Sequence, residues 1–218
     1  SQNGRRWHHA LHQTADLPEQ LIRGREHIYL GWFYRHYGHL PHAISPEDEK
    51  EYLRNYANDE TTRNGISHGL LALIENPDAF DILKSDATMV SSGVDEMLRW
   101  GTPVNNFLRT ATCDTELHGV EIKEGDAVVM LYASANRDPS VFTDPDTFSL
   151  DRPWSELRRH FSFGWGMHHC LGAPIARQTA RVALETLLDR FPTMRLTGES
   201  ERIAPEFLWG KRKLWVTW

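Results

Sequence analysis

The stretch that most constrains this chain is a glycine-rich loop, residues 160–172 (HFSFGWGMHHCLG), which leads to a single cysteine. Its glycines are Gly164, Gly166 and Gly172. Glycine removes the side chain where the backbone must approach a bulky group or take a positive φ angle. Cys170 then lies in a turn whose backbone N–H groups can point at its sulfur, and such donors stabilise a thiolate. The loop therefore predicts a metal centre that is held through the Cys170 sulfur, with the ring of Phe163 beside it.

The spacing Phe-x-x-Gly-x-His-x-Cys-x-Gly, from Phe163 to Gly172, resembles the haem loop of cytochromes P450. Ala176-Arg177 matches the alanine–arginine pair that follows the loop in that family. The resemblance implies haem b as the cofactor and Cys170 as the iron ligand. The cofactor-binding positions of the family correspond here to Phe163, Gly164, His168, Cys170 and Gly172. A lone cysteine would also fit a buried position at a helix–loop junction, but the full spacing favours haem ligation.

Four charged residues before the cysteine loop resemble the same family. Glu96 and Arg99 lie at i, i+3, so they share one helical face and can pair. Arg152 corresponds to the arginine that joins this pair in a buried network. Arg109 matches a position that binds a haem propionate, for which a guanidinium is suited by its two parallel N–H donors. A surface arginine on a strand is the alternative interpretation of Arg109.

The sequence from Glu60 to Asn64 (ETTRN) resembles the acid–alcohol step of the long P450 helix that faces bound oxygen. In that family the acid and the alcohol relay protons, which makes Glu60 and Thr61 the candidate catalytic residues. The alternative is a helix start that is rich in capping residues. One position departs from the family pattern, because Asn58 stands where glycine is usual.

Residues 1–57 differ in character, and they hold seven of the twelve histidines. The phrases at residues 16–22 (DLPEQLI), 24–26 (GRE) and 32–35 (WFYR) resemble the cap of α/β-hydrolases of the epoxide hydrolase and haloacetate dehalogenase type. We therefore expect two regions: a helical cap-like segment over residues 1–57, and the haem-binding C-terminal region of a cytochrome P450 over 58–218. Residues 65–69 (GISHG) match the nucleophile-elbow pattern, but the polar sequence before them is not the strand that an elbow needs.

The resemblance implies a mostly α fold with small antiparallel β-sheets, namely the haem-side half of the P450 fold, preceded by a helical segment. Short strands are expected between residues 110 and 129, and residues 128–131 (VVML) are expected to form a buried run. An amphipathic helix should follow the cysteine and end near Phe191-Pro192.

Composition limits the partners. The net charge of −6 argues against a general nucleic-acid binder, and no apolar run is long enough to cross a membrane. Cys113 and Cys170 are the only cysteines, so no disulfide framework is implied, which favours a cytoplasmic protein.

The resemblance therefore implies a haem-thiolate monooxygenase of bacterial type, truncated or chimeric and weakly active. The family implies a ferredoxin-type or flavoprotein electron donor and a small apolar organic substrate. Self-association through exposed aromatic side chains is a further expectation. Two alternatives stay open: an α/β-hydrolase fragment, and a non-catalytic fusion product.

Overall fold

The computed structural model describes residues 60–202 and 208–218. The predictions made for residues 1–57 and for Asn58 lie outside these ranges, as does the side chain of Glu60. Within the described ranges, no helix is both long enough and apolar enough to span a membrane.

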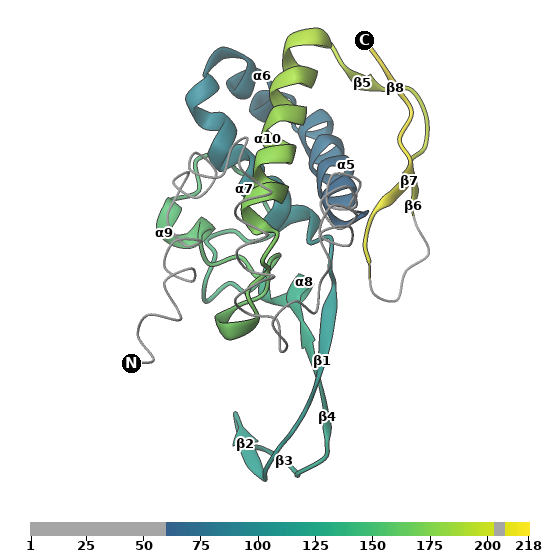
Figure 1. Cartoon of the computed structure of the whole chain (residues 1–218). Coiled ribbons are helices and arrows are strands. Elements are labelled where there is room, and N and C mark those ends of the chain that lie inside the picture. The colour runs from purple at the N-terminus through teal and green to yellow at the C-terminus, as the bar shows by residue number, and fades with distance from the viewer. Residues whose placement is uncertain (1–59, 203–207) are drawn as a thin grey trace, which may run out of the picture.

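The described chain is mostly helical with small antiparallel sheets, as the sequence predicts (Figure 1). The helices are α5 (Glu60–Glu75), α6 (Pro77–Ser85), η2 (Ala87–Met89), α7 (Val90–Gly101), α8 (Tyr132–Ala135), α9 (Trp154–Leu157), η3 (Gly166–His168) and α10 (Ala173–Arg190). The strands are β1 (Asn106–Thr110), β2 (Thr115–Leu117), β3 (Val120–Ile122), β4 (Ala127–Leu131), β5 (Arg195–Leu196), β6 (Glu201–Arg202), β7 (Lys211–Lys213) and β8 (Val216–Thr217). In this part of the chain they pair as β1–β4, β2–β3, β5–β8 and β6–β7.

The hydrophobic core lies among α5, α6, α7 and α10 (Figure 1). Its most buried members include Ala72, Leu73, Leu83, Val90, Val94, Met97 and Leu184. Helices α5 and α7 cross closely because Gly69 has no side chain, and a Cβ atom at this position would overlap Met97. Close contact of this kind brings apolar side chains of both helices out of water, at a gain of about 25 cal/mol per Å² of buried apolar surface.

Local sequence explains where the helices begin and end. Asn76 separates α5 from α6; its side-chain amide donates to the Ala72 carbonyl (2.7 Å), and Pro77 then opens α6. Proline suits the first helical turn, because the N–H group that it lacks has no partner there. Helix α7 ends at Thr102, whose backbone is left-handed (φ 35°) and whose hydroxyl donates to the Arg99 carbonyl (2.8 Å).

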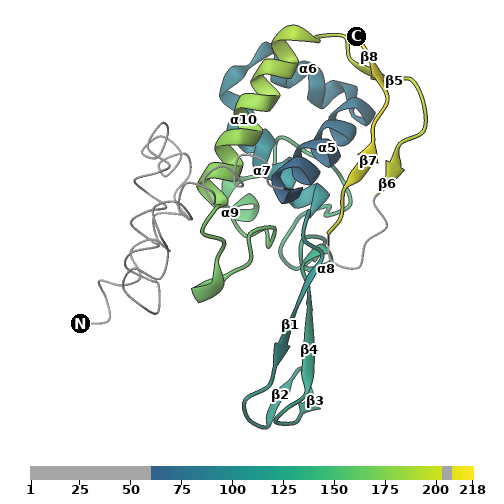
Figure 2. The ribbon, with the colours of Figure 1, turned by 45° about the vertical axis from the view of Figure 1, so that its right-hand side comes forward.

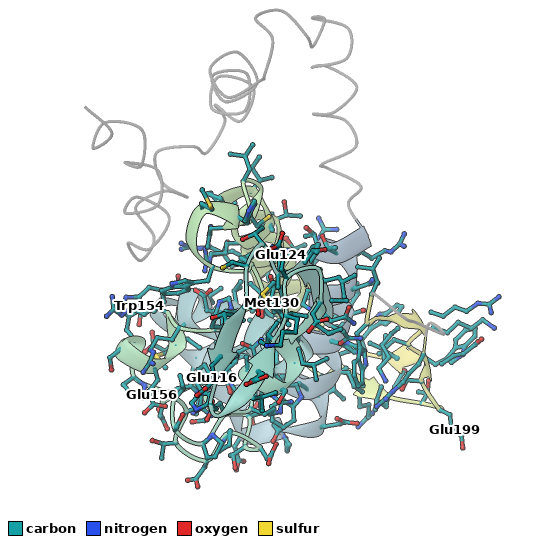
Figure 3. All side chains as sticks on the ribbon, turned by 90° about the horizontal axis from the view of Figure 1, so that it is seen from below. Glu116, Glu124, Met130, Trp154, Glu156 and Glu199 are labelled. Carbon is teal, nitrogen blue, oxygen red and sulfur yellow. The ribbon has the colours of Figure 1, made fainter. Side chains whose placement is uncertain are left out.

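Strands β1 and β4 form a ribbon that projects from the helices, with β2 and β3 at its far end (Figures 1 and 2). Figure 3 looks at this ribbon from below, with Glu116 and Met130 labelled on it. The predicted buried run over residues 128–131 is wrong, because Val129 and Leu131 are more than half exposed. A two-stranded ribbon has no second layer in the described structure to cover it, so alternate apolar side chains face solvent.

The C-terminal strands lie along one side of the helices, near α5 (Figures 1 and 2). Figure 3 shows Glu199, between β5 and β6, on the opposite side of the molecule from Trp154 and Glu156 of α9. A single bridge between Val104 and Leu208 ties these strands to the segment that follows α7.

Glu96 and Arg99 of α7 form the buried ion pair that the sequence predicts, and both side chains are fully buried. The guanidinium Nε and Nη2 atoms of Arg99 each donate to one carboxylate oxygen of Glu96 at 2.7 Å. Arg152 also donates to Glu96, with its Nε atom 3.2 Å from Oε2. The backbone N–H of Ser149 adds a further hydrogen bond to the carboxylate (3.0 Å). The Glu96 charge is therefore compensated on both oxygens.

The remaining N–H groups of both arginines donate to backbone carbonyls of the long segment after α8. Arg99 donates to the carbonyls of Asn136 (2.8 Å) and Pro145 (2.9 Å) through Nη1. Arg152 donates to the Thr143 carbonyl (2.6 Å). A segment with little regular structure is thus fixed on α7 by charge-assisted hydrogen bonds, which are stronger than neutral ones.

Replacing Arg99 by alanine should lower the free energy of unfolding by about 3–5 kcal/mol, because Glu96 would remain buried without its main partner. Urea denaturation followed by circular dichroism measures the change. The matched control is Lys84→Ala, which breaks the exposed i, i+3 pair with Asp81 and should cost at most about 1 kcal/mol. Equal stability of Arg99→Ala and the parent would contradict this account.

Candidate functional site

The cysteine loop runs from His160 to Gly172, between α9 and α10, and folds back on itself. Gly164 and Gly166 both have φ angles of +69°, a conformation that glycine adopts without strain, as the sequence predicts. The turn is closed by a hydrogen bond from the Cys170 N–H to the Phe163 carbonyl (2.8 Å). Gly172 has an ordinary φ of −81° and caps the start of α10, so it serves close approach rather than positive φ.

A cavity of about 310 Å³ opens beside this loop. Helix α5, the end of α7, strand β1, helix α8, the loop and the start of α10 all contribute to its walls. Its lining residues are Thr61, Thr62, Leu98, Pro103, Val104, Phe107, Tyr132, Ser162, Phe163, Gly164, His168, Cys170, Gly172 and Ala176. The lining is mainly apolar, which is typical of sites for cofactors and organic ligands.

Most of the predicted site residues meet at this cavity. They are Thr61, Phe163, Gly164, His168, Cys170 and Gly172. Segments about 100 residues apart in the sequence, α5 and the cysteine loop, thus line one space. Glu60 is the first residue of α5 and directly precedes Thr61.

Arg109 is not part of the cavity wall. It lies on β1, and its Nη1 atom donates to the carbonyl of Leu108 (2.9 Å), while its guanidinium lies 5.7 Å from the Phe107 ring centroid. Residues two apart on a strand share one face, so Arg109 lies on the same face of β1 as Phe107, which does line the cavity.

A buried cluster beneath the loop was not predicted from the sequence. Asp95 of α7 accepts a hydrogen bond from the Nε atom of Arg177 (2.8 Å) and lies 2.9 Å from Nε2 of His160. The backbone N–H of Ser162 donates to Nδ1 of His160 (3.2 Å). His160 therefore carries its proton on Nε2 and donates it to Asp95, which corresponds to the neutral ring.

The pKa values in this cluster agree with the geometry. Burial lowers the pKa of His160, although the carboxylate of Asp95 acts in the opposite direction. Burial would raise the pKa of Asp95, but the charge of Arg177 and the hydrogen bond with His160 outweigh it and hold the pKa at about 2. Asp95 is therefore ionised and His160 neutral at pH 7.

This Asp95–His160–Arg177 cluster supports the ring that stands beside the cysteine turn. The Arg177 guanidinium lies 4.6 Å from the centroid of the Phe163 ring, and the His160 ring lies 5.8 Å from it. The Phe163 carbonyl in turn accepts the hydrogen bond from Cys170. The position of the cysteine thus depends on a carboxylate of α7.

Asn136 forms a second buried support for the loop. Its side-chain oxygen accepts from the Phe161 N–H (2.6 Å), and its amide donates to the hydroxyls of Thr102 (2.8 Å) and Ser162 (3.0 Å). The Ser162 hydroxyl donates to the Leu98 carbonyl (2.7 Å). Because Asn136 is fully buried, each of these bonds satisfies a group that has no access to water.

Sequence reasoning missed the cavity residues Phe107 and Tyr132 and the buried groups Asp95 and Asn136. Tyr132 directly follows the strand β4, and a tyrosine at such a junction is a weak signal for a cavity. Asp95 is adjacent to Glu96, so two consecutive acids on one helix were a signal that both helical faces meet cations.

The fold is mostly helical, and a turn that carries one cysteine borders an apolar cavity. Proteins that hold a haem through sulfur have this combination. The model of the cytochrome P450 family matches residues 56–214. The chain therefore belongs to the cytochrome P450 family, whose members bind haem b.

Curated relatives match the chain over much of its length. A steroid C26-monooxygenase of Mycolicibacterium smegmatis is 42% identical over 142 residues, which are 65% of this chain and 35% of that protein. A methyl-branched lipid omega-hydroxylase of Mycobacterium tuberculosis is 43% identical over 164 residues, which are 74% of this chain and 38% of that protein. The chain thus spans little more than a third of the length of these relatives.

Solved structures show the same partial correspondence. CYP109E1 from Bacillus megaterium, in complex with corticosterone, has a TM-score of 0.72 and 36% identity, and the match covers 79% of this chain and 47% of that one. Cytochrome P450-153 from Novosphingobium aromaticivorans has a TM-score of 0.71 and 34% identity over 92% of this chain and 53% of that one.

The donor set of the site fits haem. Among the described residues, no group of three or more histidine, cysteine or acidic side chains could hold a bare metal ion. A single sulfur can hold iron when a macrocycle brings the other ligands, and the apolar walls suit the faces of such a ring. Gly164 adds to the fit, because a Cβ atom there would lie 3.4 Å from the Tyr132 hydroxyl and narrow the cavity.

Because Asp95 is ionised in the folded protein, the free energy of unfolding should fall as the pH becomes acidic. Its folded pKa lies below its unfolded value, so its contribution is present above pH 4 and is lost as the pH falls towards 2. Between pH 5 and pH 3 the parent should lose about 1 kcal/mol more of unfolding free energy than Asp95→Asn loses. Urea titrations at both pH values measure it. Asp81→Asn, at an exposed pair, serves as the control, and identical pH slopes for Asp95→Asn and the parent would contradict the assignment.

Proposed function

We propose that this chain is the haem-binding part of a cytochrome P450-type monooxygenase, with the Cys170 thiolate as the ligand of the haem iron. One observation carries the proposal: the glycine turn places Cys170 on the wall of an apolar cavity that Thr61 of α5 also lines. Haem held through a thiolate supplies dioxygen activation and insertion of one oxygen atom into an organic substrate.

The residues of the loop would hold and shield the cofactor. Phe163 covers the side of the turn next to the sulfur, and the glycines let the backbone approach the ring closely. His168 at the cavity wall and Arg109 on β1 are the candidate donors to the carboxylates at the edge of the haem. For Arg109 this role requires that its side chain exchange the Leu108 carbonyl for a propionate, to which a guanidinium binds more strongly.

Thr61 and Glu60 would manage protons in the cavity. The position of Thr61 on the cavity wall supports a role for its hydroxyl in delivering a proton to an oxygen bound there. Glu60 precedes it on α5 and would resupply the proton from solvent.

The substrate class follows from the walls of the cavity. Leu98, Val104, Phe107 and Ala176 present apolar surface, so we propose a small apolar organic substrate. The names of the relatives, which act on a steroid or on methyl-branched lipids, support the same class. Electrons would come from a ferredoxin-type or flavoprotein donor, and two cysteines outside any disulfide support a cytoplasmic setting for this exchange.

Residues 1–57 are proposed to form a separate helical segment, similar to the cap of an α/β-hydrolase and unlike the rest of the chain. The match to the P450 family begins at residue 56, which supports a boundary near this point. Exposed apolar side chains on the ribbon, such as Leu108, Val129 and Leu131, favour self-association.

Two alternatives are separable from this proposal. A hydrolase would need a nucleophile elbow, but residues 65–69 lie inside α5, where the Ser67 hydroxyl donates to the Asn64 carbonyl (3.1 Å). A non-catalytic fusion product would bind haem poorly or not at all, and the visible absorption spectrum of the purified protein distinguishes it from a haem enzyme.

The Cys170 assignment predicts a spectroscopic difference. The haem-loaded chain should show, in its reduced carbonyl complex, the red-shifted Soret band of thiolate-bound haem, and Cys170→Ala should lose it. Cys113→Ala is the matched control, since Cys113 is the other free and exposed cysteine and lies on the ribbon outside the cavity. A Cys170→Ala spectrum identical to that of the parent would overturn the proposal.

The proposed role of Thr61 predicts a change in the ratio of hydrogen peroxide to oxidised substrate. If its hydroxyl delivers a proton, Thr61→Ala should release severalfold more hydrogen peroxide per oxidised substrate, while Thr61→Ser should resemble the parent. Peroxide and product are measured together with an electron donor supplied. Equal ratios in Thr61→Ala and the parent would remove Thr61 from the proposed mechanism.

A further inference from the structure

A second and larger cavity, of about 700 Å³, has residues of α5 and of the C-terminal strands in its wall. Figures 1 and 2 show that these strands lie beside α5. Its walls come from α5, the end of α7, the region of α8, and the strands β6 and β7. Its described lining residues are His68, Leu71, Ala72, Glu75, Trp100, Gly101, Thr102, Ala133, Arg137, Ser200, Arg202, Trp209 and Lys211. None of these residues lines the cavity of Cys170.

The charged groups of this second cavity are mainly cationic. Arg137, Arg202 and Lys211 face it, and among its described lining residues Glu75 is the sole acid. A chain with a net charge of −6 thus concentrates positive charge at this one concave place. Surface potentials of one sign inside a cleft raise the local concentration of oppositely charged ligands.

Contacts within the wall hold its cations in place. Nη2 of Arg137 donates to the Trp100 carbonyl (3.1 Å), and its Nε lies 3.4 Å from the exposed carboxylate of Asp146. Nζ of Lys211 donates to the Ser200 hydroxyl (2.8 Å). An ammonium group has three N–H donors, so Lys211 can bind an anion and keep this contact.

Burial and neighbouring charges lower the pKa values of three groups in the wall. Burial, followed by the charges of Lys211 and Arg202, lowers the pKa of His68 to about 4. Burial and the charge of Arg202 lower the pKa of Lys211. Burial and the charge of Arg99 lower the pKa of Arg137 to about 10. His68 is therefore neutral at pH 7, and an anion in the cavity would stabilise the charged forms of Lys211 and Arg137.

Aromatic rings form the rest of the recognition surface. The guanidinium of Arg137 lies 4.0 Å from the centroid of the Trp100 ring. Trp209 lies edge-to-face with His68 at 6.3 Å and beneath the Arg202 guanidinium at 5.2 Å. An apolar or aromatic body could pack between these indole rings while its charged end meets the cations.

We propose that this cavity binds an organic anion, a carboxylate or phosphate group joined to an aromatic or apolar body, at a site separate from the haem cavity. Lys211 through its ammonium group and Arg202 through its guanidinium receive the charged end, Arg137 adds positive charge to the wall, and Trp100 and Trp209 flank the body. The volume is within the range of sites that enclose a small organic molecule.

Isothermal titration calorimetry on the full chain at low ionic strength tests the site with three probes: benzoate, phenyl phosphate and benzyl alcohol. Benzoate and phenyl phosphate distinguish the two anionic groups, and at least one of them should bind. Benzyl alcohol has the same ring without the charge and should bind at least about tenfold more weakly than the better anion, the factor expected for one charge-assisted hydrogen bond.

Variants locate the binding on the cation cluster. Lys211→Gln and Arg137→Gln should each raise the dissociation constant of the better anion by about tenfold or more. Arg212→Gln is the matched control, because Arg212 is the next residue on β7, is 69% exposed in its side chain and does not line the cavity. It should leave the dissociation constant within about twofold. Lys211 is the decisive position if Arg137→Gln fails to fold.

Three results would overturn the proposal. They are the absence of binding by both anions, benzyl alcohol binding as tightly as they do, and Lys211→Gln weakening binding no more than Arg212→Gln. Because none of these measurements uses haem or turnover, their outcome is independent of the proposed monooxygenase function.

Discussion

The structure depends first on the burial of Arg99. Its side chain is wholly enclosed, and an enclosed charge is tolerated only where each donor has an acceptor. Glu96 accepts hydrogen bonds from two of its N–H groups, and the carbonyls of Asn136, Pro145 and Thr147 accept from the others. One side chain of α7 thereby fixes a segment that has few regular elements of its own, and Asn136 in that segment then holds the cysteine loop.

Helix α7 is therefore the element that connects stability with the site. One of its faces carries Glu96 and Arg99 towards the segment after α8, and Asp95 meets His160 and Arg177 beneath the loop. The carbonyl of Leu98, also on α7, accepts a hydrogen bond from the Ser162 hydroxyl. The position of Cys170 is set through these contacts, so changes in α7 that leave the cavity untouched should still move the sulfur. The cation-lined cavity begins at the end of this same helix, at Trp100.

Local patterns in the sequence predicted those structural features that depend on residues close together in the chain. The Glu96–Arg99 spacing, the glycines with positive φ and the helix after the cysteine are all observed as predicted. The failure at residues 128–131 has a physical reason: apolar composition indicates burial only when another layer covers the strand, and composition does not specify that layer. The Asp95–His160 contact joins residues 65 positions apart, so no local spacing could indicate it. The approach of α5 to the loop was found only through family resemblance.

The central claim is that the folded cysteine turn presents the Cys170 sulfur to haem iron. X-ray absorption at the iron edge of the haem-loaded chain tests this most directly, because it reports which elements surround the metal. The account predicts one sulfur neighbour at a short, thiolate-type distance together with the four nitrogen atoms of the macrocycle. Iron surrounded by nitrogen and oxygen alone would contradict it.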